Sequence, residues 1–194
     1  MVQGNTAKII RYMLRNTEKL GYNINQIAKS VNISAGSSFK ILKDLEINKL
    51  VIAQAVGNAV YYALDLKNPE THKLCELLLL EEKRSLKGYP KLYSESIQHF
   101  DKAELIILFG SVLTKKEFND VDVLFMTDKV KEVNAFCLEL SKLRTKPVVP
   151  LIIKKKDLVA ELKNKKEAIL SIVKNCVVLK GESAFVEVIK YAKR

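Results

Sequence analysis

The residues best suited to chemistry lie in one short stretch, in which Gly110-Ser111 is followed by Asp120-Val121-Asp122. Side chains alternate between the two faces of a strand, so Asp120 and Asp122 are expected to point to one side and to bind a cation together. The Gly-Ser pair ends an apolar run, and a tight turn there can offer backbone N–H groups and a hydroxyl to phosphate oxygens. These residue types and their spacing predict a site for a metal ion and a nucleotide.

Alternating apolar runs indicate the elements that would position this site. After a helix over 91–100, the pattern predicts strands over 105–109 and 121–126, joined by a short basic connection. A helix over 129–143, a strand over 148–153, short helices near 158–162 and 168–173, a strand over 176–179 and a helix from Ser183 follow. This order predicts an α/β domain with a small mixed sheet covered by helices.

The stretch Leu108-Phe109-Gly110-Ser111, with Asp120-Val121-Asp122-Val123 after it, resembles the signature of the DNA polymerase beta superfamily. The order of elements and the ending at 177–182 are similar to the minimal nucleotidyltransferase branch, and the resemblance covers about half the chain. It implies that Gly110 and Ser111 bind the phosphates of a nucleoside triphosphate. It also implies that Asp120 and Asp122 are catalytic residues that hold Mg²⁺.

Three features depart from that family's pattern. Eight residues without a glycine separate Ser111 from Asp120, and Asn119 stands where a serine often precedes the first aspartate. The later strand over 148–153 carries no third carboxylate. The pattern therefore predicts a site that binds Mg²⁺ and nucleotide with impaired acid–base chemistry, unless Asp157 or Glu104 reaches the pair. The alternative is an ordinary strand-turn-strand whose aspartates face solvent, although charges flanking a buried strand are costly without a purpose.

The first third of the chain is organised differently. Helices are expected from Asn5 to about Leu20, over 24–31 and over 34–46, before strands over 50–55 and 60–64 around a hairpin turn. This order resembles the winged helix-turn-helix of small prokaryotic regulators. Lys49 occupies the position of that family's usual glycine, and Asn48 is expected to absorb the change by adopting the left-handed conformation.

The third of these helices is the expected DNA-reading element. Its buried stripe is predicted to be Phe39, Leu42 and Leu45. The candidate DNA-binding residues on its other face and at its start are Ser34, Ser37, Ser38, Lys40 and Lys43. Nine basic and four acidic residues between positions 1 and 67 favour a polyanionic partner. The alternative is that the fold serves protein contacts, with the lysines forming a solvated face.

These patterns divide the chain into a winged helix-turn-helix (1–67), a connecting helix (68–88) and a nucleotidyltransferase-like domain (89–194). Leu74 and residues 77–80 give the connecting helix a leucine-rich surface, which would either mediate a homodimer or pack on the second domain. A homodimer is the expected state.

Bulk composition excludes several classes of protein. A net charge of +11 fits a nucleic-acid partner, and the 48% apolar content contains no run long enough for a membrane span. A cytoplasmic protein is expected, because the start resembles no signal peptide. Cys75, Cys137 and Cys176 have no ligand or disulfide spacing and are expected to fill the core.

The leading hypothesis is a DNA-binding transcriptional regulator whose nucleotidyltransferase-fold domain binds nucleotide and Mg²⁺ but is catalytically impaired. The alternative is an active Mg²⁺-dependent nucleotidyltransferase, with the winged helix for autoregulation. Such an enzyme would transfer a nucleotide from a triphosphate to a protein partner such as a toxin, or to a small molecule. A third hypothesis is a protein-interaction module built from the two folds.

Overall fold

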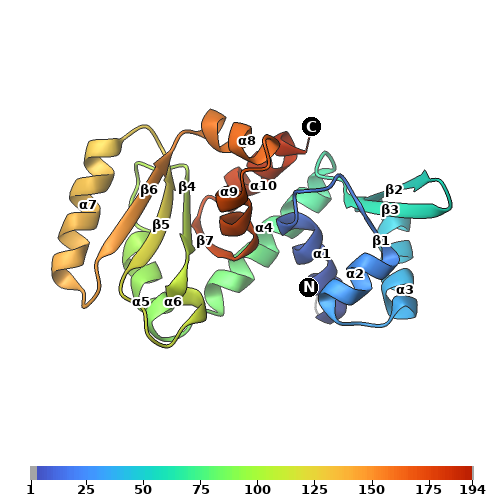
Figure 1. Cartoon of the computed structure of the whole chain (residues 1–194), viewed down its shortest axis with the longest axis horizontal. Helices are drawn as coiled ribbons and strands as arrows, with labels where there is room; N and C mark the ends of the chain where they lie inside the picture. Colours follow the sequence, from blue (N-terminus) through green and yellow to red (C-terminus); the bar gives the residue numbers. More distant parts are fainter. Residues whose placement is uncertain (1–3, 194) are drawn as a thin grey trace.

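The structure is a computed structural model that describes residues 4–193 (Figure 1). Its first half contains, in chain order, α1 (Gly4–Arg15), β1 (Tyr22–Asn23), α2 (Ile24–Val31), α3 (Ala35–Ile47), β2 (Val51–Val56), β3 (Ala59–Leu64) and α4 (Pro69–Arg84). Its second half contains α5 (Gly88–Ile97), β4 (Leu105–Phe109), α6 (Ser111–Thr114), β5 (Val121–Met126), α7 (Val130–Leu143), β6 (Val148–Ile153), α8 (Lys155–Lys163), α9 (Glu167–Lys174), β7 (Cys176–Lys180) and α10 (Glu182–Ala192). Helices pack with two sheets, which confirms the expected α/β class.

Local sequence signals explain the N-terminal part, which comprises α1 to β3. α2 begins with a capping box, in which the Asn23 side chain accepts a bond from the Gln26 amide and the Gln26 side chain accepts one from the Asn23 amide. β2 and β3 form the predicted antiparallel hairpin, with Gly57-Asn58 between the paired residues Val56 and Ala59. The short strand β1, which the sequence patterns did not predict, joins β3 and gives the order β1-β3-β2.

The link between α3 and β2 corrects one expectation. Lys49 adopts the left-handed conformation with φ of 59°, whereas Asn48 has φ of −80°. Asn48 instead donates from its side-chain amide to the Asp44 carbonyl oxygen (2.8 Å) at the end of α3. The Asn68 side chain donates to the Lys49 carbonyl oxygen (2.9 Å), so a contact from the start of α4 helps to hold this strained residue in place.

The C-terminal part, from α5 to α10, is built on a sheet with the order β6-β5-β4-β7. β4 is antiparallel to β5 and β7, whereas β5 and β6 run parallel. Helices cover both faces: α5 and α7 lie against one, and α8 to α10 lie against the other (Figure 1). Because both faces are covered, four of the five residues of β4 are buried and the strand reads as a continuous apolar run.

The apolar core on the second face continues into the N-terminal part. One cluster of buried residues joins Ile10 and Leu14 of α1 to Leu124 of β5. Leu78 and Leu79 of α4 belong to the same cluster and are each 1% exposed, whereas Leu77 of the same helix is 54% exposed. Leu78 and Leu79 therefore pack within the chain, which is the second of the two roles considered for the connecting helix, and the homodimer stays a prediction.

Polar contacts reinforce this junction, and Arg15 at the end of α1 lies at its centre. One guanidinium nitrogen of Arg15 donates to the Val173 carbonyl oxygen and to Cys176 Sγ, both at 3.0 Å. A second nitrogen pairs with the Glu82 carboxylate of α4. Arg15 also lies 5.8 Å from the centre of the Phe185 ring in α10. A single side chain of the N-terminal part thus contacts α4, the α9–β7 segment and α10.

Two features of the second half differ from the sequence prediction. α5 begins at Gly88, three residues before the predicted start at Lys91. Pro90 falls in the first turn of α5, where its missing N–H costs no helical hydrogen bond. The short basic connection predicted after Gly110 starts with the helical turn α6, which the sequence patterns did not predict.

The described residues bear on the expectations about membrane-spanning helices and about the cysteines. No helix within residues 4–193 is both long and apolar enough to cross a membrane. Cys75, Cys137 and Cys176 are free and buried, as expected for cysteines that fill a core.

Candidate functional site

The candidate metal and nucleotide site lies where β4 ends and β5 begins. The antiparallel register places Phe109 of β4 opposite Asp122 of β5, so Gly110 follows directly beside the Asp122 carboxylate. Gly110 has φ of 81° and ψ of −156°, a region that is essentially restricted to glycine. A Cβ atom at Gly110 would lie 2.2 Å from Asp122 Oδ2. The backbone conformation therefore favours glycine here, and a larger residue would also have to displace the Asp122 carboxylate.

Asp120 and Asp122 act on each other electrostatically, which agrees with the prediction that they share one side of the strand. Partial burial raises the pKa of Asp122, and the negative charge of Asp120 raises it further. A cation between the two carboxylates would relieve this repulsion. The two aspartates thus form a partly buried pair that favours binding of a positive charge.

Among the described residues, no third carboxylate joins the pair. The parallel register places Val149 of β6 opposite Asp122, and this valine is 44% exposed although it is apolar. Glu104 lies at the other end of the sheet, where its amide donates to the Met126 carbonyl oxygen, and Asp157 lies in the first turn of α8. Within residues 4–193 no three His, Cys, Asp or Glu side chains gather in a group that could hold a metal ion. A divalent ion here would have two carboxylates and would need other oxygens from its ligand.

A pair of carboxylates still fits Mg²⁺ bound together with a nucleotide. Mg²⁺ in phosphate-transfer sites commonly takes one or two carboxylates and completes its shell with phosphate oxygens and water. Ser111 is partly exposed at the start of α6, next to Gly110, and Lys115 and Lys116 are exposed just beyond this turn. The arrangement can therefore offer a hydroxyl and positive charges beside the carboxylates.

The second candidate site is the outer face of α3, and here one predicted residue is wrong. Ser38, expected to face DNA, has 0% exposure, whereas Phe39, expected in the core, is 48% exposed. The buried stripe is Ser38, Leu42 and Leu45, which repeats at helical spacing as well as the predicted stripe does. Ser38 therefore cannot contact DNA in this conformation.

The other candidate residues of α3 are accessible. Ser34 caps the helix by accepting a bond from the Ser37 amide (3.1 Å). Lys40 and Lys43 are exposed, and Lys43 Nζ pairs with the Glu46 carboxylate one turn away (2.8 Å). Phe39 adds an aromatic ring to this surface. The face of α3 thus combines hydroxyl, cationic and aromatic groups.

Comparisons with known proteins add no name to these sites. No family model matches the chain, and a search of curated proteins finds no match. The geometry of the two sites and the resemblances carried by their motifs are therefore the basis for a function.

Proposed function

We propose that the protein is a DNA-binding transcriptional regulator, in which a winged helix-turn-helix is packed against a nucleotidyltransferase-fold part that has kept a site for Mg²⁺ and nucleotide. The observation that carries the proposal is the uncovered face of α3. That helix follows α2 after a short turn, precedes the β2–β3 hairpin, and exposes Lys40, Lys43 and Phe39. An exposed helix with cationic and hydroxyl groups can enter a major groove while its lysines neutralise phosphates.

Replacing Lys40 and Lys43 together is the direct test of this proposal. We expect Lys40→Gln/Lys43→Gln to weaken binding to a duplex enriched from a random pool by about tenfold near 100 mM salt. The plot of the logarithm of the association constant against the logarithm of the salt concentration should become less steep by about 2. Each lysine lost from a phosphate contact removes about one released counterion. Fluorescence anisotropy over a series of salt concentrations measures both quantities.

A matched control changes the same charge elsewhere. Lys131 and Lys142 are exposed on α7, which lies at the opposite end of the molecule from α3 (Figure 1). Lys131→Gln/Lys142→Gln should leave the affinity and the salt slope close to wild type. Equal losses in the two double variants would show that net charge alone attracts DNA. Absence of salt-dependent binding by the wild type would overturn the proposal.

A nucleotidyltransferase activity is the second candidate, and the Gly110–Asp122 contact favours it. In this function Asp120 and Asp122 would hold Mg²⁺, which would neutralise phosphate charge as pyrophosphate leaves. Gly110 and Ser111 would bind the triphosphate, and the acceptor would be a protein partner such as a toxin or a small molecule. Residues 4–193 place no third carboxylate beside the pair to activate that acceptor, so binding without efficient turnover is the form we favour.

Substitution of Asp120 tests the carboxylate site. We expect Asp120→Asn to weaken Mg²⁺-dependent binding of ATP or another triphosphate by at least about tenfold, because it removes one of two charged ligands. Binding by the wild type should also weaken as pH falls, since the raised pKa of Asp122 makes protonation compete with the metal at higher pH than for an ordinary aspartate. Calorimetric titration with and without EDTA measures both effects.

The control for this experiment is Glu70→Gln, since Glu70 is an exposed acid in the first turn of α4, outside the carboxylate site. It should bind the Mg²⁺ complex as the wild type does. If Asp120→Asn also binds it with unchanged affinity, the nucleotide does not occupy this site. Pyrophosphate release by the wild type that Asp120→Asn abolishes would establish the enzyme.

A further inference from the structure

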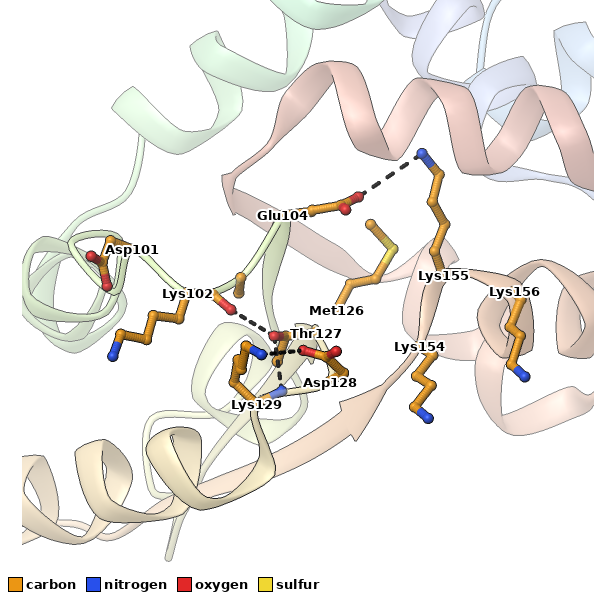
Figure 2. A pocket seen from close by; sticks show the side chains of 11 residues that line it. Asp101, Lys102, Glu104, Met126, Thr127, Asp128, Lys129, Lys154, Lys155 and Lys156 are labelled. Carbon is orange, nitrogen blue, oxygen red and sulfur yellow. Dashed lines mark hydrogen bonds and ion pairs between the residues drawn. The ribbon is translucent and has the colours of Figure 1, made fainter.

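A cavity of about 610 Å³ lies at the end of the sheet opposite Asp122 (Figure 2). Three segments form it: residues 101–104 before β4, residues 126–129 at and after the end of β5, and residues 154–156 after β6. β5 and β6 are parallel, so their carboxyl ends meet here. In α/β sheets such an edge is a common place for ligands, and the cavity volume suits a small molecule.

Lysines outnumber acidic residues in the lining of this cavity. Five of its lining residues are lysines and three are acidic, with the lysines at 102, 129, 154, 155 and 156. Lys129 pairs with Asp128 (3.4 Å), and Lys155 lies 3.9 Å from Glu104 and 3.6 Å from Glu187. Within the described residues, the other three lysines make no ion pair with a carboxylate. They are left to attract an anion from solution.

Two of the three unpaired lysines point the same way, whereas Lys102 extends from the other wall of the cavity, away from Lys154 and Lys156 (Figure 2). In Figure 2, Lys154 and Lys156 extend to one side of the segment after β6, whereas Lys155 points to the other side, toward Glu104. Lys102, Lys154 and Lys156 are all exposed. Lysine ammonium groups bind phosphates as point charges, and the mobility of long side chains allows several to converge on one polyanion.

The backbone beneath these lysines is held in place by Thr127. Its hydroxyl donates to the Lys102 carbonyl oxygen (2.6 Å) and accepts from the Lys129 amide (3.2 Å). The Thr127 amide donates to the Ile153 carbonyl oxygen (3.0 Å), directly before Lys154. One residue thus ties together all three segments that form the cavity. A preformed backbone reduces the ordering cost of binding.

We propose that this cavity binds a small ligand that carries a polyphosphate group, without a metal ion. The three unpaired lysines would supply the positive charge that Mg²⁺ would supply at the carboxylate site. A concave cavity of this volume fits a compact ligand better than it fits a DNA backbone, which presents its phosphates on a convex surface. The proposal is independent of DNA binding by α3 and of nucleotide binding at Asp120 and Asp122.

The test is a calorimetric titration of the full chain with inorganic tripolyphosphate in EDTA. We expect one saturable site in the wild type. The variant Lys102→Gln/Lys154→Gln/Lys156→Gln should bind at least tenfold more weakly. Lys156→Gln alone should weaken binding two- to threefold, and it tests the proposal if the triple variant fails to fold. Circular dichroism confirms that each variant is folded.

Two controls separate this cavity from general attraction and from the other site. Lys163→Gln/Lys165→Gln/Lys166→Gln removes the same charge from exposed lysines at the end of α8 and in the link to α9, and should bind within twofold of wild type. Asp120→Asn should bind as wild type does. Equal weakening in both triple variants, or no saturable binding by the wild type, would overturn the proposal. The proposal would also be overturned if Lys102→Gln/Lys154→Gln/Lys156→Gln loses DNA binding while tripolyphosphate binds neither to this variant nor to the wild type.

Discussion

Replacing Gly181 with alanine is expected to lower the free energy of unfolding by about 3–4 kcal/mol. Gly181 lies between β7 and α10 and has φ of 82°. A Cβ atom there would lie 2.0 Å from the Glu104 carbonyl oxygen and 3.0 Å from Leu105 Cα. These are backbone atoms of the segment that leads into β4, so no side chain can rotate to make room. Urea denaturation monitored by circular dichroism measures the loss.

Gly57→Ala is the matched control for this substitution. Gly57 also has a positive φ, of 57°, but a Cβ atom there would meet nothing within 4 Å. Its replacement should cost only the backbone strain, about 1 kcal/mol. Similar losses for Gly57→Ala and Gly181→Ala would show that the close approach of β4 does not determine the need for Gly181.

Arg15→Met is expected to destabilise the protein by about 3 kcal/mol, because breaking a buried ion pair leaves its partners without a charge or a donor. The substitution would remove the bonds from Arg15 to Val173 and Cys176 and its pair with Glu82. Glu82 would keep Arg11, whose Nε lies 3.1 Å from Glu82 Oε1, and this limits the loss. Equilibrium urea denaturation measures the change.

The control is Arg11→Met on the same helix. The side chain of Arg11 is 28% exposed, against 10% for Arg15, and its ion pairs are with Glu81 and Glu82. Partly exposed ion pairs contribute up to about 1 kcal/mol, so Arg11→Met should cost less. A loss for Arg15→Met no larger than that for Arg11→Met would show that the buried contacts contribute little to stability.

Elements with a strong local pattern could be predicted from the sequence. The strands at 105–109, 121–126 and 148–153 have the predicted bounds, because long β-branched and apolar runs bounded by polar turns leave few alternatives. The hairpin at Gly57-Asn58 was equally clear. Local propensity and tertiary packing agree in these segments.

The face of α3 could not be predicted from spacing. Ser38 and Phe39 both lie three or four residues before Leu42, so both fit a buried stripe that includes Leu42 and Leu45. Hydrophobicity favoured Phe39, whereas the packed structure buries Ser38 and exposes Phe39. Which neighbour faces inward depends on how α3 lies against the rest of the molecule, and that information is absent from the helix itself.

The candidate site was predicted in part. The sequence motif predicts Gly110, Asp120 and Asp122 as site residues. The register of β4 and β5 places Gly110 against Asp122. The lysine-lined cavity was missed, although the run Lys154-Lys155-Lys156 was a visible signal. Its other lysines, Lys102 and Lys129, are far from the run in the sequence and join it only through sheet pairing and Thr127. Contacts of that range are not encoded in local spacing.

The contacts of Arg15 also bear on how the chain folds during synthesis. Its partner Cys176 lies 161 positions later, and a ribosome that adds about 5–20 residues per second needs roughly 10–30 s to produce that segment. Until then, the guanidinium and the adjoining apolar face of α1 lack their final partners. The N-terminal part is therefore made first but cannot reach its final packing until the segment around Cys176 has been made.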